Sequence, residues 1–556
     1  MVRYLALGDG AITVEFGREI SPSINAQVRS FHQALLANPP AGLLDVIPTY
    51  RSITVQFDPL RPEADTFEDA LRSIDERAQA VELSAGQLHT LPVHYGGEDG
   101  PDLEEVAQLH GLTIDEVIAL HARREYLVYC LGFSPGFALL GGLPEELATP
   151  RLGTPRKHVP AGSVGVGGQQ TGVYPVATPG GWRLLGRTSF RFFDVNQDPP
   201  SPIRPGDRIL FEPVDKLPPG ESARDAESVK KTTKPALEVL DPGLMTTVQD
   251  LGRWGYQAYG VSVAGPVDDL SFRMANAAAG NPPAAACLEC TLAGPTLLAR
   301  QACTIAVAGA AIEPRVNGHL TARGVPIRLR PGDRLEVGAP RRGLRSYLAL
   351  GGGIDVPEVL SSRATYTRGC MGGSEGRPLR AGDTLARADA GRQQPRVAPD
   401  PPLPWPGKPV TVRVVLGPQD DYFDAGVLRE FLSRPFTISS DADRMGYRLS
   451  GYRLRHSGPS EIVTDGLVAG SIQVPGHGDP IVMLADRASV GGYPKIATVI
   501  TADLRIISQC TPGMRLRFEA VGAADARAIL RRQHADLLGD AGDELGSMLG
   551  WTGSSA

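Results

Sequence analysis

Residues 151–188 read RLGTPRKHVPAGSVGVGGQQTGVYPVATPGGWRLLGRT, a stretch so rich in glycine and proline that no helix can run through it. Its turns are expected to expose backbone N–H groups close to the guanidinium groups of Arg151, Arg156 and Arg187. Exposed amides beside arginines suit a carboxylate, an amide or a phosphate. For any single glycine, punctuation between short β-strands is the alternative explanation.

Part of this pattern occurs again near the C-terminus. Three motifs of the first half return in the second: AGSV at 161–164 as AGSI at 469–472, GGW at 180–182 as GGY at 491–493, and RPGDRILFEPV at 204–214 as TPGMRLRFEAV at 511–521. The three separations are 308, 311 and 307 residues. Because self-similarity at nearly constant spacing indicates repeated units, we predict two related halves joined end to end.

Composition limits the class of protein. The chain has 556 residues, too many for one core, and its 65 glycines and 48 prolines favour short strands and turns. The net charge of −6 argues against a nucleic-acid surface, and six cysteines are too few for a disulfide framework. The start, MVRYLALGDGAITVEFG, lacks the features of a signal peptide, and no apolar run approaches the ~18 residues of a membrane span. We predict a cytoplasmic protein with no membrane or nucleic-acid partner.

Two periodicities organise the first 88 residues. AITVEFG at 11–17 and SITVQFDP at 52–59 alternate apolar and polar residues, as strands do. Ser21 and Pro22 suit the start of a helix, and Phe67 begins a second helical repeat of apolar residues. Residues 1–88 are therefore predicted to form a small α+β domain.

Strand-like segments and polar breaks set the remaining boundaries. In order, we predict a β-barrel, a polar linker, a β-rich domain, a proline-rich linker, a second barrel, and a C-terminal helix with a flexible tail, at 89–215, 216–234, 235–390, 391–408, 409–521 and 522–556. The predicted fold class is mainly β with α+β parts.

One segment, DLEEVAQLHGLTIDEVIALHARR at 102–124, is compatible with a DNA-binding helix-turn-helix. Asp115 and Glu116 stand at the start of its second helix, where they would repel DNA phosphates. We therefore predict an αα-hairpin packed beside the first barrel.

Several short motifs resemble metal, catalytic or nucleotide-binding sites, but the surrounding sequence argues against these functions. Cys287 and Cys290 have no second pair at zinc-ligand spacing, so no metal site is predicted. GCMGGSEGRPL at 369–379 resembles the serine loop of amidases, but no lysine or histidine is placed to activate Ser374. The sequence has neither a phosphate loop nor a dinucleotide-binding glycine motif after a strand, so no classical nucleotide-binding fold is expected.

Longer motifs identify a family. In the first half, GDGAITVEFG, HYGGEDGPDL, LGFSPGF, TPRKHVPAGSVGVGGQQTGVYP and TPGGW closely resemble the B subunit of bacterial 5-oxoprolinase, in a group that includes a sporulation-kinase inhibitor and was formerly labelled allophanate hydrolase subunit 1. In the second half, TTVQDLGRWGY, GPVDDLSFRMAN, LECTLAGP, RMGYRL, AGSIQVPGHGDPI and GGYPKIATVI closely resemble the C subunit of the same enzyme, formerly allophanate hydrolase subunit 2. Together the halves resemble the carboxyltransferase domain of urea carboxylase, which implies cyclophilin-like β-barrels.

The sequence also departs from some relatives. It has no biotin attachment site, that is, no lysine flanked by methionine in a small β-domain, and it has neither an ATP-grasp segment nor an amidase domain. The resemblance therefore implies a fused B–C component of an ATP-dependent 5-oxoprolinase, with ATP and Mg²⁺, 5-oxoproline as substrate and the A subunit of the enzyme as a separate protein. Self-association stays open. So do two alternatives, a carboxyltransferase working with a separate biotin carrier and a regulatory protein that inhibits a histidine kinase.

The resemblance also implies a chemistry for the site. Phosphorylation of the lactam oxygen would make the ring carbon electrophilic, a step that needs positioning and charge neutralisation. The residues assigned to catalysis are Arg156, Arg187, Arg444, Asp486 and Lys495. The residues assigned to substrate binding are Gly162, Ser163, Gln169, Gln170, Tyr174, Arg363, Gly470, Ser471, Gln473, Gly491, Gly492 and Tyr493. Since neither half carries the whole set, the site is expected to be shared between the halves.

Overall fold

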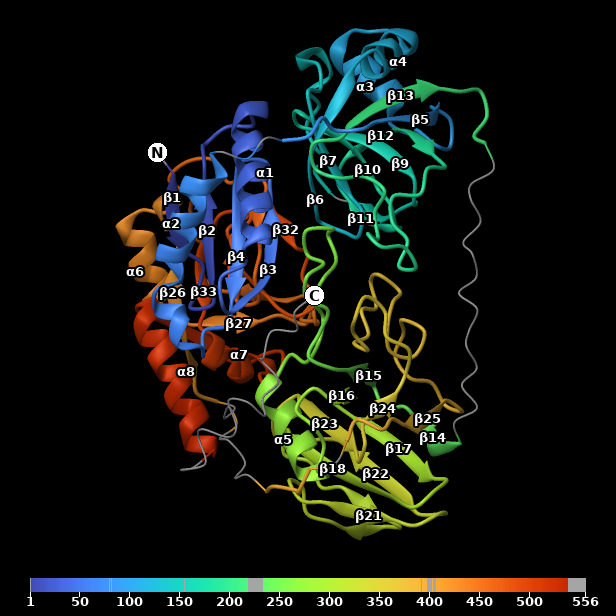
Figure 1. The fold of residues 1–556 in the computed structure, drawn as a ribbon, viewed down its shortest axis with the longest axis vertical. Helices are drawn as coiled ribbons and strands as arrows, with labels where there is room; N and C mark the ends of the chain where they lie inside the picture. Colours follow the sequence, from blue (N-terminus) through green and yellow to red (C-terminus); the bar gives the residue numbers. More distant parts are fainter. Residues whose placement is uncertain are drawn as a thin grey trace.

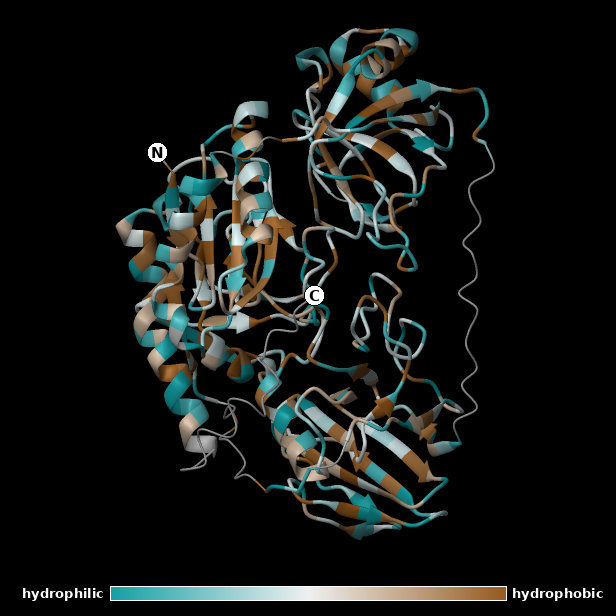
Figure 2. Ribbon diagram, in the orientation of Figure 1, coloured by the Kyte–Doolittle hydropathy of each residue, from teal (hydrophilic) through white to brown (hydrophobic). Residues whose placement is uncertain are grey.

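The structure is a computed structural model that describes residues 2–538 except positions 80, 82, 155, 219–233, 392, 398–402 and 404–406. The chain forms four globular parts (Figure 1). Figure 2 shows hydrophobic residues along the strands of each part, as expected for sheets that bury one or both faces. None of the helices in the described residues is long and apolar enough to cross a membrane.

The N-terminal part is a four-stranded antiparallel sheet in the order β1-β2-β4-β3 with two helices on one face. Its elements are β1 (Arg3–Ala6), β2 (Ala11–Glu15), α1 (Pro22–Ala37), β3 (Leu43–Pro48), β4 (Ser52–Phe57), η1 (Pro62–Asp65) and α2 (Phe67–Ala78). The alternating residues Val14 and Val55 point to the helices, where they pack with Phe31 and Leu71. The opposite face is polar, and there Thr13 and Thr54 share a hydrogen bond of 3.1 Å.

The first barrel is closed and seven-stranded, in the order β10-β7-β6-β13-β5-β12-β9. Its strands are β5 (Leu88–Tyr95), β6 (Glu125–Leu131), β7 (Ala138–Gly141), β9 (Ser163–Gly167), β10 (Gln170–Val173), β12 (Arg183–Thr188) and β13 (Arg208–Pro213). A separate ribbon pairs β8 (Arg156–Val159) with β11 (Thr178–Gly180), and η2 (Glu145–Leu147) precedes it.

The predicted αα-hairpin is present as α3 (Leu103–His110) and α4 (Ile114–Ala122), inserted between β5 and β6. Gly111 ends α3 in the left-handed conformation, and Thr113 and Glu116 form a capping box at the start of α4. The acidic start of α4 is therefore explained by capping.

The third part packs two sheets, ordered β20-β19-β22-β17-β14-β25-β24 and β15-β16-β23-β18-β21. Its strands are β14 (Pro235–Asp241), β15 (Met245–Gln249), β16 (Cys287–Thr291), β17 (Gly294–Ala299), β18 (Cys303–Gly309), β19 (Arg315–Val316), β20 (His319–Leu320), β21 (Ile327–Leu329), β22 (Arg334–Gly338), β23 (Arg345–Leu350), β24 (Ile354–Asp355) and β25 (Thr384–Arg387). Helix α5 (Asp269–Ala279) packs on β18 and β23 and is capped by Asp268, whose carboxylate accepts a hydrogen bond from the Ser271 amide.

The last part is a second closed barrel, in the order β26-β33-β30-β31-β28-β27-β34. Its strands are β26 (Val410–Leu416), β27 (Phe436–Ile438), β28 (Gly446–Ser450), β30 (Ser471–Gln473), β31 (Ile481–Met483), β33 (Lys495–Val499) and β34 (Arg515–Ala520). The other elements are η3 (Asp420–Tyr422), α6 (Ala425–Ser433), α7 (Thr501–Ser508), α8 (Ala523–Leu538) and a ribbon of β29 (Asp465–Gly466) with β32 (Val490–Gly491).

The two barrels have the same topology, strand by strand. Taken in chain order, the seven strands of each barrel occupy the same places in the ring, and each barrel is closed by its first and last strands in parallel. Gly162 and Gly470 occupy equivalent turns, with φ of +83° and +89°. The duplication predicted from three short motifs is therefore confirmed.

The N-terminal sheet lies beside the second barrel, at the other end of the sequence (Figure 1). The Asp9 carboxylate accepts hydrogen bonds of 2.9 Å from both the amide and the hydroxyl of Thr501 at the start of α7. Asp65 pairs with Arg527 and Arg531 of α8. Residues 219–233, most of the predicted polar linker, lie outside the described residues.

Candidate functional site

One segment, residues 249–268, contacts all four parts of the molecule and is called here the junction segment. Its Gly255 amide donates to Asp45 of the N-terminal sheet at 2.8 Å. Tyr259 pairs in parallel with Leu131 of the first barrel. The Ser262 hydroxyl donates to the Ala485 carbonyl of the second barrel at 3.0 Å. Any site shared between the halves would be organised by this segment.

Two arginines assigned to catalysis in the first half face one acidic loop. Arg156 Nη2 lies 2.6 Å from the carboxylate of Asp102, which also accepts a hydrogen bond from the Leu184 amide at 2.7 Å. Arg187 Nε donates to the Ala161 carbonyl at 2.9 Å, and its Nη1 lies 3.8 Å from Asp99. The Arg156 and Arg187 side chains remain 29% and 43% exposed, so both can reach a ligand.

Tyr174 lies beside this pair within an aromatic cluster. Its ring contacts Phe137 and Trp182 edge to face. Burial raises the pKa of Tyr174 to about 12, so the phenol keeps its proton at neutral pH. The Gln170 side chain hydrogen-bonds the phenol of Tyr50, a residue of the N-terminal part, whereas Gln169 is exposed.

The glycine turns expected to offer free amides are closed within the barrels. The Gly162 amide donates to the Tyr174 carbonyl at 2.7 Å, and the Gly470 amide to the Met483 carbonyl at 2.8 Å. The neighbouring amides of Ser163 and Ser471 donate to backbone carbonyls at 3.3 and 3.2 Å. A Cβ at Gly162 would lie 2.3 Å from a carbonyl oxygen, so close approach of two chain segments explains this glycine. The expectation of free amides here is corrected.

In the second half, Lys495 forms a buried network that crosses the halves. Its Nζ donates to Asp465 at 2.7 Å and to the Gly466 carbonyl at 3.1 Å. The other carboxylate oxygen of Asp465 accepts from Ser52 of the N-terminal sheet at 2.6 Å. Burial opposes ionisation of Asp465, but Lys495 and Arg51 hold its pKa down at about 2.

Most of the other polar and glycine residues assigned to this half adjoin Lys495. Gln473 is opposite Lys495 on neighbouring strands, and its amide donates to the Tyr493 carbonyl at 3.4 Å. A Cβ at Gly491 would lie 2.4 Å from the Gln473 amide nitrogen. The structure thus brings together six assigned residues on β30, β32, β33 and the loop between β32 and β33: Ser471, Gln473, Gly491, Gly492, Tyr493 and Lys495.

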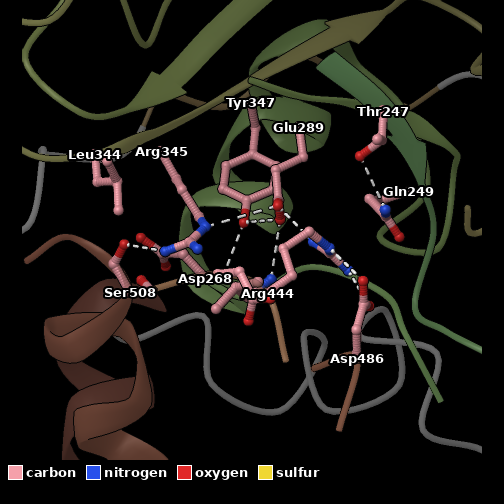
Figure 3. A network of polar contacts seen from close by, with 12 residues as sticks. Thr247, Gln249, Asp268, Glu289, Leu344, Arg345, Tyr347, Arg444, Asp486 and Ser508 are labelled. Atoms are coloured by element: carbon pink, nitrogen blue, oxygen red, sulfur yellow. Dashed lines mark hydrogen bonds and ion pairs between the residues drawn. The ribbon is translucent and has the colours of Figure 1, made fainter. Parts of the chain in front are cut away.

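Arg444 and Asp486 lie in a different buried network (Figure 3). Arg444 pairs with Glu289 and, at 2.8 Å, with Asp486, and it donates to the Gly265 carbonyl at 2.7 Å. Burial would lower the pKa of Arg444, but the two carboxylates raise it above its usual value. Glu289 also accepts from the Tyr347 hydroxyl at 2.7 Å.

This second network joins the third part to the second barrel and is closed to solvent. Arg444 and Asp486 are 4% and 3% exposed. Arg363 lies elsewhere on the third part, where it pairs with Glu358. The structure therefore does not bring Arg156 and Arg444 into one network.

Family models match both halves of the chain. The model described as "Carboxyltransferase domain, subdomain C and D" matches residues 2–203, and "Carboxyltransferase domain, subdomain A and B" matches 259–520. The chain is 42% identical to the 5-oxoprolinase B subunit of Bacillus subtilis over 216 residues, 37% of this chain and 90% of that protein. It is 36% identical to the 5-oxoprolinase C subunit of Escherichia coli over 282 residues, 51% of this chain and 90% of that protein. The chain belongs to the family of 5-oxoprolinase B and C subunits.

A solved structure shows that both members of this family also occur joined in one chain. The crystal structure of TTHA0988 is 36% identical, has a TM-score of 0.81, and covers 93% of this chain and 100% of that one. In the present 5-oxoprolinase family chain, the B-like half precedes the C-like half, as the sequence motifs indicated.

Sequence reasoning missed the acidic partners in this family member. Asp102 holds Arg156, and Asp465 holds Lys495. Asp102 could have been found, because it lies in the motif HYGGEDGPDL. Asp465 gave no signal, since its neighbours in the sequence form no recognisable motif. Within the described residues, no three His, Cys, Asp or Glu side chains gather closely enough to hold a metal ion.

Proposed function

We propose that this chain is the B–C component of an ATP-dependent 5-oxoprolinase, which activates the lactam of 5-oxoproline for hydrolysis to glutamate together with the A subunit of the enzyme, a separate protein. One observation carries the proposal: the two halves are similar, in order, to proteins named as the B and C subunits of 5-oxoprolinase, over 90% of each. We further propose that it acts in the cytoplasm.

The exposed arginines are the best candidates to meet the substrate. Opening a lactam with ATP needs cations that neutralise the substrate carboxylate and the phosphoryl group in transfer. Of the assigned cations, Arg156 and Arg187 are partly exposed, whereas Arg444 and Lys495 are buried. We assign Arg156 and Arg187 to substrate contact and give Arg444, Asp486 and Lys495 a positioning role.

Tyr174 and Asp102 shape the surroundings of this contact. Tyr174 keeps its phenolic proton and can donate a hydrogen bond to a carbonyl or phosphoryl oxygen. Asp102 fixes the direction of the Arg156 guanidinium group, because its second carboxylate oxygen is held by the Leu184 amide. Nucleoside triphosphate and Mg²⁺ would supply the phosphoryl group.

The test is release of ADP and formation of glutamate by the purified chain mixed with a candidate for the A subunit. Release that requires 5-oxoproline and both proteins is expected. Arg156→Ala should reduce this turnover on the order of ten- to a thousand-fold without unfolding the protein. Arg208→Ala, which removes an exposed arginine of the same barrel paired with Glu125, is the matched control. Lactam-independent transfer of a carboxyl group from a biotinylated protein would overturn the proposal.

A further inference from the structure

A cavity on the second barrel is not used by the residues discussed so far. Its volume is about 1040 Å³, and it lies between the start of α6, the loop after β28 and the turn between β30 and β31. Such a volume is at the upper end of the range for small-molecule sites. The lining is polar and holds three arginines and two histidines: Arg429, Arg453, Arg455, His456 and His477.

Two of these arginines have side chains without a partner in the part of the chain that the structure describes. Neither the Arg429 nor the Arg455 guanidinium group makes a hydrogen bond or an ion pair there. Both side chains are exposed, so they are hydrated in the free protein and accessible to a ligand. Arg453 lies 3.8 Å from Asp479, which leaves most of its donors available as well.

The acidic residues of the lining are already engaged. The Asp424 carboxylate accepts a hydrogen bond from the Val427 amide at 2.8 Å and caps α6. Glu430 is ion-paired with Arg434. His456 donates to the Val474 carbonyl at 3.0 Å and packs on the ring of Phe423, which fixes one wall of the cavity. The lining therefore carries three arginines against two carboxylates, and its net charge is positive.

The duplicated topology explains why the space exists. In the first barrel two helices, α3 and α4, are inserted between the first two strands, whereas in the second barrel only α6 and the short η3 occupy that position. The turn between β30 and β31 corresponds to the turn between β9 and β10 of the first barrel, which carries Gln169. One half has thus filled this end of its barrel more fully than the other.

We propose that this cavity binds the phosphoryl groups of a nucleoside triphosphate, with Arg429 and Arg455 as the main ligands. Guanidinium groups match phosphate oxygens in both charge and geometry, and unpaired donors need no existing bond to be broken. The choice of a nucleotide rests on the proposed function, whereas recognition of phosphoryl groups rests on the cavity alone.

The test is isothermal titration calorimetry of the full chain with Mg²⁺·ATP, tripolyphosphate and inorganic phosphate, in the absence of 5-oxoproline and of any other protein. We expect the R429Q/R455Q variant to bind ATP at least tenfold more weakly than the wild type. R429K/R455K, which keeps the charge but loses the two-pronged guanidinium geometry, should bind ATP with an affinity between those of the wild type and R429Q/R455Q. The control R515Q/R517Q removes two exposed arginines of β34 that do not line the cavity and should bind normally.

Comparing the ligands shows whether the site binds a nucleotide or free phosphate. Tighter binding of ATP than of inorganic phosphate, lost in R429Q/R455Q, supports a nucleotide site, and equal binding of both, lost in the same variant, supports a site for free phosphate. A wild type that binds none of the three ligands, or equal affinity in R429Q/R455Q and wild type, overturns the proposal. Because no lactam is present, this failure is separate from failure of the 5-oxoprolinase assay.

Discussion

Replacing Lys495 by methionine would show how much the buried ion pair with Asp465 contributes to the free energy of unfolding. Lys495 and Asp465 are 0% and 1% exposed, and removal of one partner from such a pair typically costs about 3–5 kcal/mol because the other charge stays buried. The pKa of Asp465, which Lys495 and Arg51 lower to about 2 against the effect of burial, has the sign of a stabilising partner, whereas burial lowers the pKa of Lys495 and offsets part of this gain. We therefore expect Lys495→Met to lower the free energy of unfolding by about 3 kcal/mol at pH 7.5.

The effect of pH on this variant has a definite sign. In the wild type, Asp465 has a depressed pKa, so its stabilisation is present above pH 4 and is lost as the pH falls through about 2. Without the ammonium group, we expect burial to outweigh the remaining Arg51 and Ser52 interactions and to raise the pKa of Asp465 above its value in the wild type. The difference in unfolding free energy between the wild type and Lys495→Met should therefore be largest at pH 7.5 and should become smaller toward pH 4.5.

The assay is urea unfolding at both pH values, with lactam-dependent turnover per folded molecule measured in parallel. The matched control is Lys495→Met combined with Asp465→Asn, which removes the charge and should recover most of the loss. Its carbonyl oxygen can accept from Gln419 while its amide donates to the Ser52 hydroxyl, which reverses the direction of that one hydrogen bond. A cost below about 1 kcal/mol that does not depend on pH would refute this reasoning. Lost turnover at unchanged stability would instead make Lys495 a catalytic residue.

Three further predictions test other features. Gly162→Ala and Gly470→Ala should each lower the Tm by several degrees in a thermal melt, because the new Cβ would lie 2.3 or 2.7 Å from a carbonyl oxygen. The control is Gly168→Ala, which has open space around it and should lower the free energy of unfolding by only about 1 kcal/mol, from its positive φ. Asp102→Asn should raise the KM for 5-oxoproline on the order of tenfold with little change in Tm, because Arg156 loses its orienting carboxylate; an unchanged KM would remove Arg156 from the site. Burial raises the pKa of Asp45 from 3.8 to about 6, so the wild type loses stability as the pH rises through this range; Asp45→Asn should therefore gain in Tm relative to wild type between pH 5 and pH 7.5, and a constant difference would contradict this.

Some features could be predicted from sequence because they depend on local rules. The duplication could be predicted because both halves need a glycine at the same turn, where two backbone segments approach closely. Gly162 and Gly470 therefore stand in similar short motifs. The position of the N-terminal sheet could not be predicted. Its contact with the second barrel depends on Ser52 and Asp465, a polar pair 413 residues apart that leaves no periodic pattern.

The burial and the ion-pair partners of the assigned residues could not be predicted either. Arg444 was assigned to an open site because an arginine is rarely buried without a partner. Its partner Glu289 is 155 residues away on β16, inside an apolar segment. The surroundings of Arg156 and Arg187 follow more directly from the sequence, since strand pairing keeps them near the acidic loop of the HYGGEDGPDL motif.

The contact between the two ends of the chain sets a waiting time during synthesis. The N-terminal sheet leaves the ribosome first, but its partner Asp465 follows Ser52 by 413 residues, which takes about 20–80 s at common elongation rates. Throughout this interval the uncovered face of the sheet meets water. That face carries Thr13, Ser52 and Thr54, whose hydroxyl groups water can solvate. These polar groups thus help the first-made part of the protein to stay hydrated until the last-made part arrives, although Leu7, Ala11 and Ile47 also wait for their apolar partners Val468 and Val490.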